Sequence, residues 1–593
     1  MKDFFSNRYR LKAMLVMVVF ACGYASVTYR LYTLQVRDHA LLRDMADKQH
    51  KCTLEIVPKR GTVYDAKMRE LAISVDTVSV YAVPPKVKDK TAAAGILAKI
   101  TGEDRRKILR ELLKTKRQFV WVARKLNPEI IEKLDKANLD GVSFLYESRR
   151  FYPNRTLASG LLGFVGLDNQ GLEGIEFQYD NYIKGESGWF IASVDARRRK
   201  IMAEVKGYVE PSGANHLVLT IDKVIQYVAE EELKKAVLEN KALSGMAVMM
   251  RPSTGEILAM ASYPVFNPNE FQDSRPQDRK NLGIIDAFEP GSTFKLITLS
   301  TALDQGAVRP DDIFFCENGA YHFRTTVYHD THEYGWLSVG QVLQLSSNIG
   351  AIKIGERLKE NNFYSSIKNF GFGEKTRVDL PGESAGMVRP VSKWSGLSMA
   401  SMSMGQEISV TALQLLTAVC TIANKGVRMQ PYVVSQVINP DGKIVLENKP
   451  KVVRKVISDK TAEFMISSME AVTSKEGTAP LAAIPGFRVG GKTGTAQKYD
   501  SAIGRYSNDK YVSSFVGVVP SRNPEIALIV VLNEPRGAAY YGGYVAAPAF
   551  RRIAERTLRY LRVAPEESPG SILSTADEAP VSIRKLSGSG SCS

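Results

Sequence analysis

The fold of this chain is decided by the stretch FEPGSTFK at residues 288–295. Pro290 and Gly291 favour a turn, and an apolar helical stretch follows it. Ser292 is therefore expected in the first turn of a helix, where backbone N–H groups are free and negative charge is favoured. Residues three apart share a helix face, so the Lys295 amine can contact the Ser292 hydroxyl. Such an amine activates a serine only when it is neutral, which burial or a neighbouring cation promotes.

Two later clusters complete the pattern, because an S-x-x-K string alone is usually an ordinary helix start. SSN at residues 346–348 opens or interrupts a helix. It offers Ser346 as a proton shuttle and Asn348 as an amide that can hold a peptide carbonyl. KTGT at residues 492–495 supplies Lys492 as the cation beside the first lysine. The three clusters together predict an acyl-transfer enzyme.

The third cluster also predicts where a substrate binds. Its Gly-rich sequence reads as an edge strand, to which a peptide can add as an extra strand. Gly494, between Thr493 and Thr495, would let the substrate backbone approach closely. Backbone N–H groups of Ser292 and Thr495 would then form an oxyanion hole, in which one donor typically lowers the barrier by roughly 3 to 4 kcal/mol.

Length and composition indicate several folded domains. A chain of 593 residues exceeds what a single hydrophobic core organises. Its 44% hydrophobic and 24% charged residues lie in the globular range and exclude a disordered or collagen-like protein. The net charge of +16 suits an anionic partner, such as nucleic acid, an acidic membrane surface or an acidic polymer. Five cysteines, at positions 22, 52, 316, 420 and 592, are too few and too scattered for a disulfide framework or a zinc site.

The N-terminal region predicts a membrane anchor. Lys12 and Arg30 bracket an uncharged, mostly apolar run of 17 residues. As a helix this run spans roughly 26 Å, the short end for a bilayer, and flanking cations can extend its reach. Because several cations precede it, the positive-inside rule places residues 1–12 in the cytoplasm and the rest outside. A cleaved signal peptide and lipidation at Cys22 are the alternatives to a retained anchor.

Composition shifts divide the chain into five predicted parts. They are a cytoplasmic tail (1–12), a transmembrane helix (13–34), a β-rich pedestal (35–215) with a helical insertion at about 85–140, a large catalytic domain (216–564), and a disordered tail (565–593). The pedestal's Gly-rich stretch from Phe151 to Tyr208 is expected to form short strands. The catalytic domain is predicted to begin with a strand and a helix from about Lys223 to Glu239. Further strands and a helix at Ala547–Leu561 close it, so the pattern is a mixed sheet layered with helices.

Three further patterns are interpreted as structural. The stretch GFRVGGKT at 486–493 satisfies the phosphate-loop pattern letter for letter, but it neither follows a buried strand nor opens an amphipathic helix. His329, Asp330 and His332 could ligate a metal ion, although a polar loop at the rim of a cleft is preferred. The basic run after Asp104 fits a solvated helix face better than a nucleic-acid surface. We therefore predict no nucleotide, metal or nucleic-acid ligand.

The three clusters, in this order, resemble those of penicillin-binding proteins and class A β-lactamases. Over nearly its whole length the chain is most similar to class B penicillin-binding proteins. Other matching motifs are MGQEI at 404–408, TALQ at 411–414, RGTVYD at 60–65 and GLEGIE at 171–176. After RGTVYD the family usually continues with Arg and Gly or Asn, whereas this chain has AKM at 66–68. The pedestal turn is therefore expected to differ.

The resemblance implies a multidomain α+β protein with a penicillin-binding serine-transpeptidase fold, on a β-rich pedestal with a single transmembrane helix. Its reaction would cross-link peptidoglycan stem peptides that end in D-alanyl-D-alanine, and β-lactams would acylate the same serine. No cofactor is implied. The resemblance implies the following roles: Ser292 is the nucleophile, Lys295 the general base, Ser346 the proton shuttle, Asn348 the substrate-positioning amide and Lys492 the electrostatic group. It also implies that Thr493, Gly494 and Thr495 bind the substrate.

A location and partners are also implied. The chain would cross the bacterial cytoplasmic membrane once, with its catalytic domain on the periplasmic side. Class B members lack a glycosyltransferase domain, so a multispan membrane glycosyltransferase and divisome proteins are the expected partners. Ser347 and Thr493 look more like division-type members, which favours septal cell-wall synthesis. The alternatives from other classes are a β-lactam-binding sensor, a β-lactamase-like hydrolase and a non-catalytic divisome scaffold.

Overall fold

The structure, a computed structural model, describes residues 2–43, 51–56, 58–117, 119–194, 200–209, 213–500 and 504–566. The chain divides into two compact units, which are Met1–Lys59 with Gly185–Gly213, and Arg60–Lys184 with Ala214–Ser593. Residues 567–593 lie outside the described residues, and with them most of the tail that the sequence predicts to be disordered.

The first unit contains a long apolar helix and a small sheet. Helix α1 (Lys2–Tyr32) continues into a π-helical turn (Thr33–Arg37). The segment Tyr9–Arg37 is long and apolar enough to cross a membrane by length and composition. Its apolar side chains are exposed, as expected for a helix whose solvent is lipid. The antiparallel sheet has the order β1-β6-β7, formed by β1 (Lys51–Ile56), β6 (Gly188–Val194) and β7 (Lys200–Val209).

A seven-stranded mixed sheet in the second unit joins the predicted pedestal to the predicted catalytic domain. Its order is β19-β18-β8-β2-β3-β4, and β5 also pairs with β3. The strands are β2 (Val63–Tyr64), β3 (Glu70–Ala82), β4 (Val120–Leu126), β5 (Val142–Phe151), β8 (His216–Leu219), β18 (Val434–Ile438) and β19 (Ile444–Glu447). β2 and β8 run parallel and the other neighbours are antiparallel. The two regions therefore share backbone hydrogen bonds, and the sheet ties them together.

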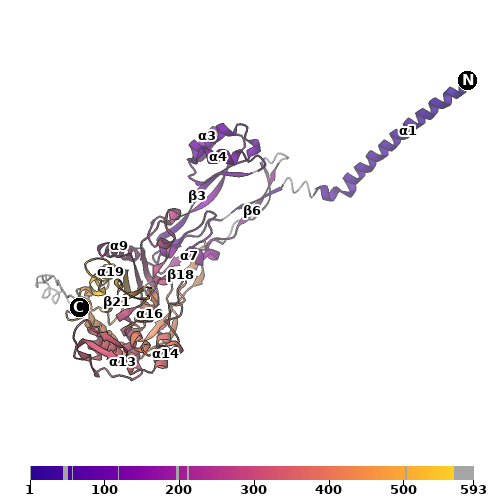
Figure 1. Ribbon diagram of the computed structural model, residues 1–593. Helices are drawn as coiled ribbons and strands as arrows, with labels where there is room; N and C mark the ends of the chain where they lie inside the picture. The colour runs from indigo at the N-terminus through magenta and orange to yellow at the C-terminus, as the bar shows by residue number, and fades with distance from the viewer. Residues whose placement is uncertain are drawn as a thin grey trace. The chain divides into compact units, whose positions relative to one another are not determined.

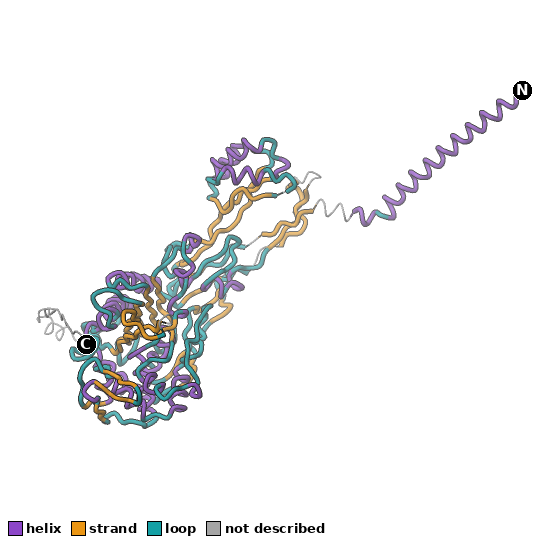
Figure 2. Tube along the Cα trace, viewed as in Figure 1, coloured by secondary structure: helices purple, strands orange, loops and turns teal. Residues whose placement is uncertain are grey.

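The far end of β3 carries a small helical subdomain, here called the head. It consists of α3 (Lys90–Thr101), α4 (Arg105–Leu112) and α5 (Ile130–Ala137); α3 and α4 pack on β4, and α5 packs on α3. Asp89 and Asp104 cap α3 and α4 with their side chains, which satisfies free N–H groups of the first turns. Figure 2 shows these helices above the strands that support them. The head has a hydrophobic core of its own, distinct from the main core.

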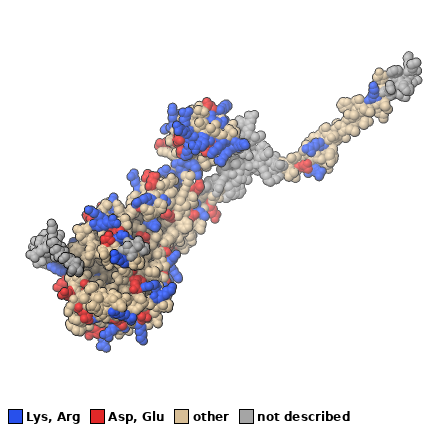
Figure 3. Space-filling view, in the orientation of Figure 1, with Lys and Arg blue, Asp and Glu red and all other residues tan. Residues whose placement is uncertain are grey.

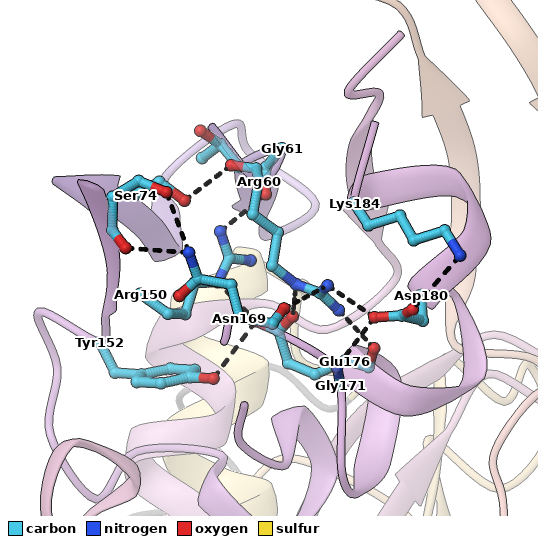
Figure 4. Close-up of polar contacts among 12 residues, drawn as sticks. Arg60, Gly61, Ser74, Arg150, Tyr152, Asn169, Gly171, Glu176, Asp180 and Lys184 are labelled. Carbon is cyan, nitrogen blue, oxygen red and sulfur yellow. Dashed lines mark hydrogen bonds and ion pairs between the residues drawn. The ribbon is translucent and has the colours of Figure 1, made fainter. Parts of the chain in front are cut away.

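A buried ionic network holds the base of the pedestal together (Figure 4). The Arg60 Nε donates to Glu176 Oε2 at 2.5 Å, and the Arg150 Nε donates to Glu176 Oε1 at 2.6 Å. Arg60 also pairs with Asp180 at 2.6 Å. Burial raises the pKa of Glu176, but the charges of Arg150 and Arg60 outweigh burial, so the pKa lies below its usual value. Both motifs RGTVYD and GLEGIE thus contribute to one charge cluster.

Replacing Glu176 by glutamine is expected to lower the free energy of unfolding by about 3 kcal/mol, because two buried guanidinium groups lose their shared carboxylate. Chemical denaturation of the full chain measures this change. Glu129→Gln is the matched control, because Glu129 is exposed at the head and forms no ion pair within the described residues. The control should change stability by less than about 0.5 kcal/mol. Equal effects of the two substitutions would contradict a stabilising role for the network.

The catalytic part is built on a five-stranded antiparallel sheet of order β10-β9-β23-β22-β21. Its strands are β9 (Ser244–Met250), β10 (Ile257–Tyr263), β21 (Gly490–Asp500), β22 (Arg505–Val519) and β23 (Ile526–Asn533). Helices α9 (Lys223–Glu239) and α19 (Ala547–Leu561) pack on each other and on this sheet, as Figure 1 shows. The fully buried helix α16 (Ala412–Ala423) also packs on it. β23 is buried at successive positions, so helices cover both of its faces.

The remaining elements flank the two large sheets of the second unit, and those between residues 159 and 183 lie in the predicted pedestal. The helices are α6 (Ser159–Leu162), α7 (Gly174–Gln178), α8 (Asp180–Ile183), α10 (Leu282–Ile285), α11 (Lys295–Asp304), α12 (Val339–Gln344), α13 (Asn348–Glu356), α14 (Glu360–Phe370), α15 (Ser398–Ser403), α17 (Asp459–Val472) and α18 (Gly542–Val545). The strands are β11 (Ala287–Phe288), β12 (Ile313–Phe315), β13 (Ala320–Phe323), β14 (Thr326–His329), β15 (Trp336–Ser338), β16 (Val410–Thr411), β17 (Val427–Met429) and β20 (Val452–Lys455).

The sequence predictions of the main elements hold, and one holds only in part. Helices α9 and α19 occupy the predicted bounds. The stretch 151–208 is predicted as short strands; it does contain β6 and most of β7, but three short helices occupy the part between Ser159 and Ile183. Helices of four or five residues are too short to show a 3.6-residue period, so the glycines dominated the sequence signal. The phosphate-loop pattern ends inside β21, so no helix opens there.

Candidate active site

The turn that carries Ser292 is a 3₁₀ turn (Gly291–Phe294) that leads directly into α11. Gly291 has a φ of +54°, which favours glycine, and its N–H donates to the Gly405 carbonyl at 3.1 Å. Ser292 is half-buried, and its hydroxyl makes no hydrogen bond to a described residue. Lys295 begins α11 and is fully buried. The MGQEI loop therefore holds the serine turn through a backbone hydrogen bond. The Ser292 hydroxyl remains accessible.

The second cluster lies between α12 and α13. Ser347 caps α13, because its Oγ accepts the Gly350 N–H at 2.9 Å. Ser346 has a φ of +61°, an uncommon conformation for a residue with a side chain. Such conformations cost free energy and cluster at functional sites. The geometry turns Ser346 toward both lysines of the site.

The third cluster lies on β21, which is the end strand of its sheet in the described part of the chain. This confirms the predicted edge strand. A Cβ at position 494 would lie 2.9 Å from the Pro290 carbonyl oxygen and would clash with the Ser514 Oγ. Gly494 is therefore required for packing β21 between the serine turn and β22, a reason that the sequence analysis did not give. The Thr495 Oγ1 accepts the Gly542 N–H at 3.0 Å.

Both buried amines converge on Ser346. The Lys295 Nζ donates to the Ser346 carbonyl at 2.6 Å and lies 3.4 Å from its Oγ. The Lys492 Nζ donates to the same Oγ at 2.9 Å. The Lys295 Nζ also donates to the Asn348 Oδ1 at 2.7 Å. The Ser346 hydroxyl thus bridges two amines that are 197 positions apart in the sequence.

The serine turn lies against the third cluster. A Cβ at Gly291 would meet the Thr495 carbonyl oxygen and the Ala496 Cβ, each at 3.3 Å. Thr493 is buried, and its Oγ1 lies 3.2 Å from the Lys492 Nζ. The structure therefore brings the three predicted clusters together around one point. Their proposed chemical roles rest on this arrangement.

Burial governs the charges of the two amines. Burial lowers the pKa of Lys295 to about 7, although the nearby charge of Asp330 opposes this shift. Burial, and then the charge of Lys295, lower the pKa of Lys492 well below its usual value. From the sequence, either burial or the Lys492 cation is expected to lower the pKa of Lys295. The structure indicates that burial is the main cause of the lowered pKa of Lys295. Charge repulsion between the two lysines instead lowers the pKa of Lys492.

Asp330, which the sequence places in a polar loop at the rim of a cleft, makes contacts that the sequence did not indicate. Its carboxylate accepts the N–H groups of Asn348 and, at 3.1 Å, of Ile349, and the Ser347 Oγ donates to it at 2.6 Å. The Asn348 Nδ2 donates to the His329 carbonyl at 2.9 Å. This loop therefore positions the second cluster. Within the described residues, no three His, Cys, Asp or Glu side chains gather to hold a metal ion.

Replacing Asp330 by asparagine is expected to slow acylation of Ser292 and to lower the pH at which the acylation rate is half-maximal. The α13 N–H groups would lose a charged acceptor, a change that typically costs about 1 kcal/mol. Removal of the negative charge would also lower the pKa of Lys295 below about 7. The pH dependence of the acylation rate measures both effects.

Asp311→Asn is the control for this prediction, because Asp311 is exposed and forms no ion pair within the described ranges. Its midpoint should equal that of the unchanged protein. A midpoint that rises in the Asp330 variant would exclude the proposed charge interaction.

Comparison with known proteins identifies the family. Residues 245–555 match the family model of the penicillin binding protein transpeptidase domain, and residues 55–219 match the penicillin-binding protein dimerisation domain. The chain belongs to the class B penicillin-binding proteins. It is thus a multidomain serine acyltransferase with the penicillin-binding fold.

Named relatives cover almost the whole chain. The peptidoglycan D,D-transpeptidase FtsI of Escherichia coli K12 is 32% identical over 95% of this chain and 93% of that protein. The probable peptidoglycan D,D-transpeptidase PenA of Neisseria gonorrhoeae is 31% identical over 94% of each chain. The aztreonam complex of penicillin binding protein 3 from Mycobacterium tuberculosis superimposes with a TM-score of 0.69 at 26% identity. That comparison covers 87% of this chain and 98% of the other.

Proposed function

We propose that this protein is a peptidoglycan D,D-transpeptidase that cross-links stem peptides ending in D-alanyl-D-alanine. The observation that carries the proposal is the convergence of Lys295 and Lys492 on the Ser346 hydroxyl, beside the serine turn and an edge strand. A lysine with a pKa of about 7 can be neutral at physiological pH, as a general base must be.

The proposed reaction has two halves. The Ser292 Oγ attacks the carbonyl of the penultimate D-alanine, while its proton passes to the Lys295 Nζ. The Oγ–C bond forms, the C–N bond to the terminal D-alanine breaks, and the leaving amine receives a proton through the Ser346 hydroxyl. An amine of a neighbouring stem peptide then attacks the acyl-serine and releases Ser292, which recovers its proton. In both halves of the reaction, the Lys492 amine donates a hydrogen bond to the Ser346 hydroxyl and acts on it electrostatically.

Substrate binding is proposed along β21. Its edge position allows a peptide to add as an extra strand beside Thr493, Gly494 and Thr495. The N–H groups of Ser292 and Thr495 stabilise the developing oxyanion. Asn348 positions the substrate through its Nδ2, which retains one hydrogen beyond that donated to His329. β-Lactams acylate the same serine.

We further propose the cellular setting of the enzyme. Residues 1–12 form a cytoplasmic tail, 13–34 the transmembrane helix, 35–215 the pedestal with its insertion at about 85–140, and 216–564 the transpeptidase domain. The candidate membrane segment and the cations before it support a single span with the catalytic domain on the periplasmic side. Ser347 and Thr493 favour septal synthesis, with a multispan glycosyltransferase and divisome proteins as partners.

Labelling with a tagged penicillin tests the proposal. The full chain in detergent is expected to form one stable adduct, on the tryptic peptide that contains Ser292. When glycan strands made by a separate glycosyltransferase are supplied, the protein should also cross-link their stem peptides. Penicillin should block this cross-linking. Rapid release of the hydrolysed drug would indicate a hydrolase instead. A stable adduct without cross-linking would favour a sensor, and an adduct on another residue would refute the site.

A further inference from the structure

The head carries a surface of uncompensated positive charge. Residues 99–117 contain eight Lys or Arg against three Asp or Glu. Figure 3 shows the Lys and Arg side chains gathered over the helices α3 and α4. Such a density of one charge favours an anionic partner, provided that the charges are not already paired.

The three acidic residues of this segment are engaged locally. Asp104 caps α4, Glu103 pairs with Lys107 at 2.8 Å, and Glu111 pairs with Lys114. They leave six exposed cations that form no ion pair within the described residues, namely Lys99, Arg105, Arg106, Arg110, Lys116 and Arg117. We call these six residues, with Leu113, the basic head surface. Its positive charge is available to a partner.

The cations and an apolar side chain share one helix face. Arg106, Arg110 and Leu113 recur at intervals of four and three residues, so they lie along one side of α4 and its C-terminal end. Ile108 and Leu112 point into the head core instead. Leu113 is 60% exposed, although it is apolar. Cations beside an exposed apolar residue are typical of segments that bind the interface of a membrane.

A membrane is within reach of this surface. The same chain carries the candidate membrane segment Tyr9–Arg37. The chain from Arg37 to Arg60 can span at most about 75 Å. The Ser74 Oγ donates to the Arg60 carbonyl, and β3 continues from there to the head at Ala82. Those eight residues of strand cover about 27 Å. This distance is much shorter than the span available to the chain from Arg37 to Arg60.

We propose that the basic head surface binds the anionic headgroups of the membrane that holds the N-terminal helix. Arg106, Arg110 and Lys116 contact lipid phosphates, and Leu113 enters the interface between them. The contact gives the protein a second attachment to the bilayer and limits the motion of the catalytic part relative to the membrane. Charge complementarity and the membrane segment in the same chain favour lipid over an acidic protein.

Hydrogen–deuterium exchange of the full chain in lipid nanodiscs tests this proposal. One set of discs contains phosphatidylcholine alone, and the other contains phosphatidylcholine with phosphatidylglycerol. Exchange of the peptide 105–117 is expected to be at least threefold slower in the anionic discs. Sodium chloride at about 1 M, where the screening length falls to about 3 Å, should remove the difference.

The triple variant Arg106→Gln, Arg110→Gln, Lys116→Gln should lose the protection in anionic discs. These side chains are exposed, so the variant is expected to fold normally and to retain its acylation by penicillin. The matched control is Lys234→Gln, Lys443→Gln, Lys460→Gln, which removes the same charge from exposed positions of the catalytic part and should keep the protection. Equal exchange in both lipids, or protection that appears only with an added acidic polypeptide, would overturn the proposal.

Discussion

Replacing Ser292 by alanine is expected to abolish adduct formation with penicillin and to reduce cross-linking by at least about 10⁴-fold. The substitution removes the only atom that forms the acyl bond in the proposed reaction. Both lysines, Ser346 and the edge strand stay in place, so substrate can still bind. Mass spectrometry of the penicillin-treated protein and analysis of cross-linked products measure the two effects.

Ser300→Ala is the matched control for this substitution. Ser300 lies in α11, eight positions after Ser292, and its buried Oγ has no hydrogen-bond partner within the described residues. Both variants delete one hydroxyl from the same helical segment, and both should change stability by less than about 0.5 kcal/mol. The control should keep full acylation. Cross-linking that persists in the Ser292 variant would show that another residue is the nucleophile, or that the protein acts as a scaffold.

Local sequence signals are sufficient to explain the helix starts around the site. The SSN cluster is predicted to open or interrupt a helix, and the Ser347 Oγ accepts an N–H group of α13. Thr411 and Gln414, in the TALQ motif, form a reciprocal capping box at the start of α16. In these cases the partners are three residues apart, so the chemistry is visible in the sequence itself.

Non-local pairings could not be read from the sequence in the same way. The carboxylate of Asp330 reaches N–H groups 18 and 19 positions away, and no periodicity links them. Glu176 lies 116 positions from Arg60, yet the two form a buried ion pair. β8 was expected to open the catalytic part, but its pairing with β2 depends on the closure of a long loop. The order of the motifs predicts that the three clusters lie close together. Only the fold shows which contacts hold them in place.

The pH dependence of acylation should report the protonation of Lys295. Its pKa of about 7 lies far below the usual value for lysine, because the side chain is buried. A general base must be neutral, so the acylation rate should rise about tenfold per pH unit below pH 7 and level off above it. Lys492 contacts the same hydroxyl, so the measured midpoint belongs to the pair of amines. Rates of penicillin acylation between pH 5.5 and 8.5 provide the test.

Lys295→Met keeps the length of the side chain but removes the base, and acylation should fall by about 10³-fold with no midpoint near pH 7. Lys125→Met is the control, because the pKa of Lys125 is lowered to about 8 by burial in the pedestal. Its loss removes a second lysine that titrates near neutrality but lies in a different part of the fold. The control should retain both the rate and the midpoint. A flat profile in the unchanged protein, or a midpoint that disappears only in the Lys125 variant, would show that Lys295 is not the base, because the titrating group would then lie outside the site.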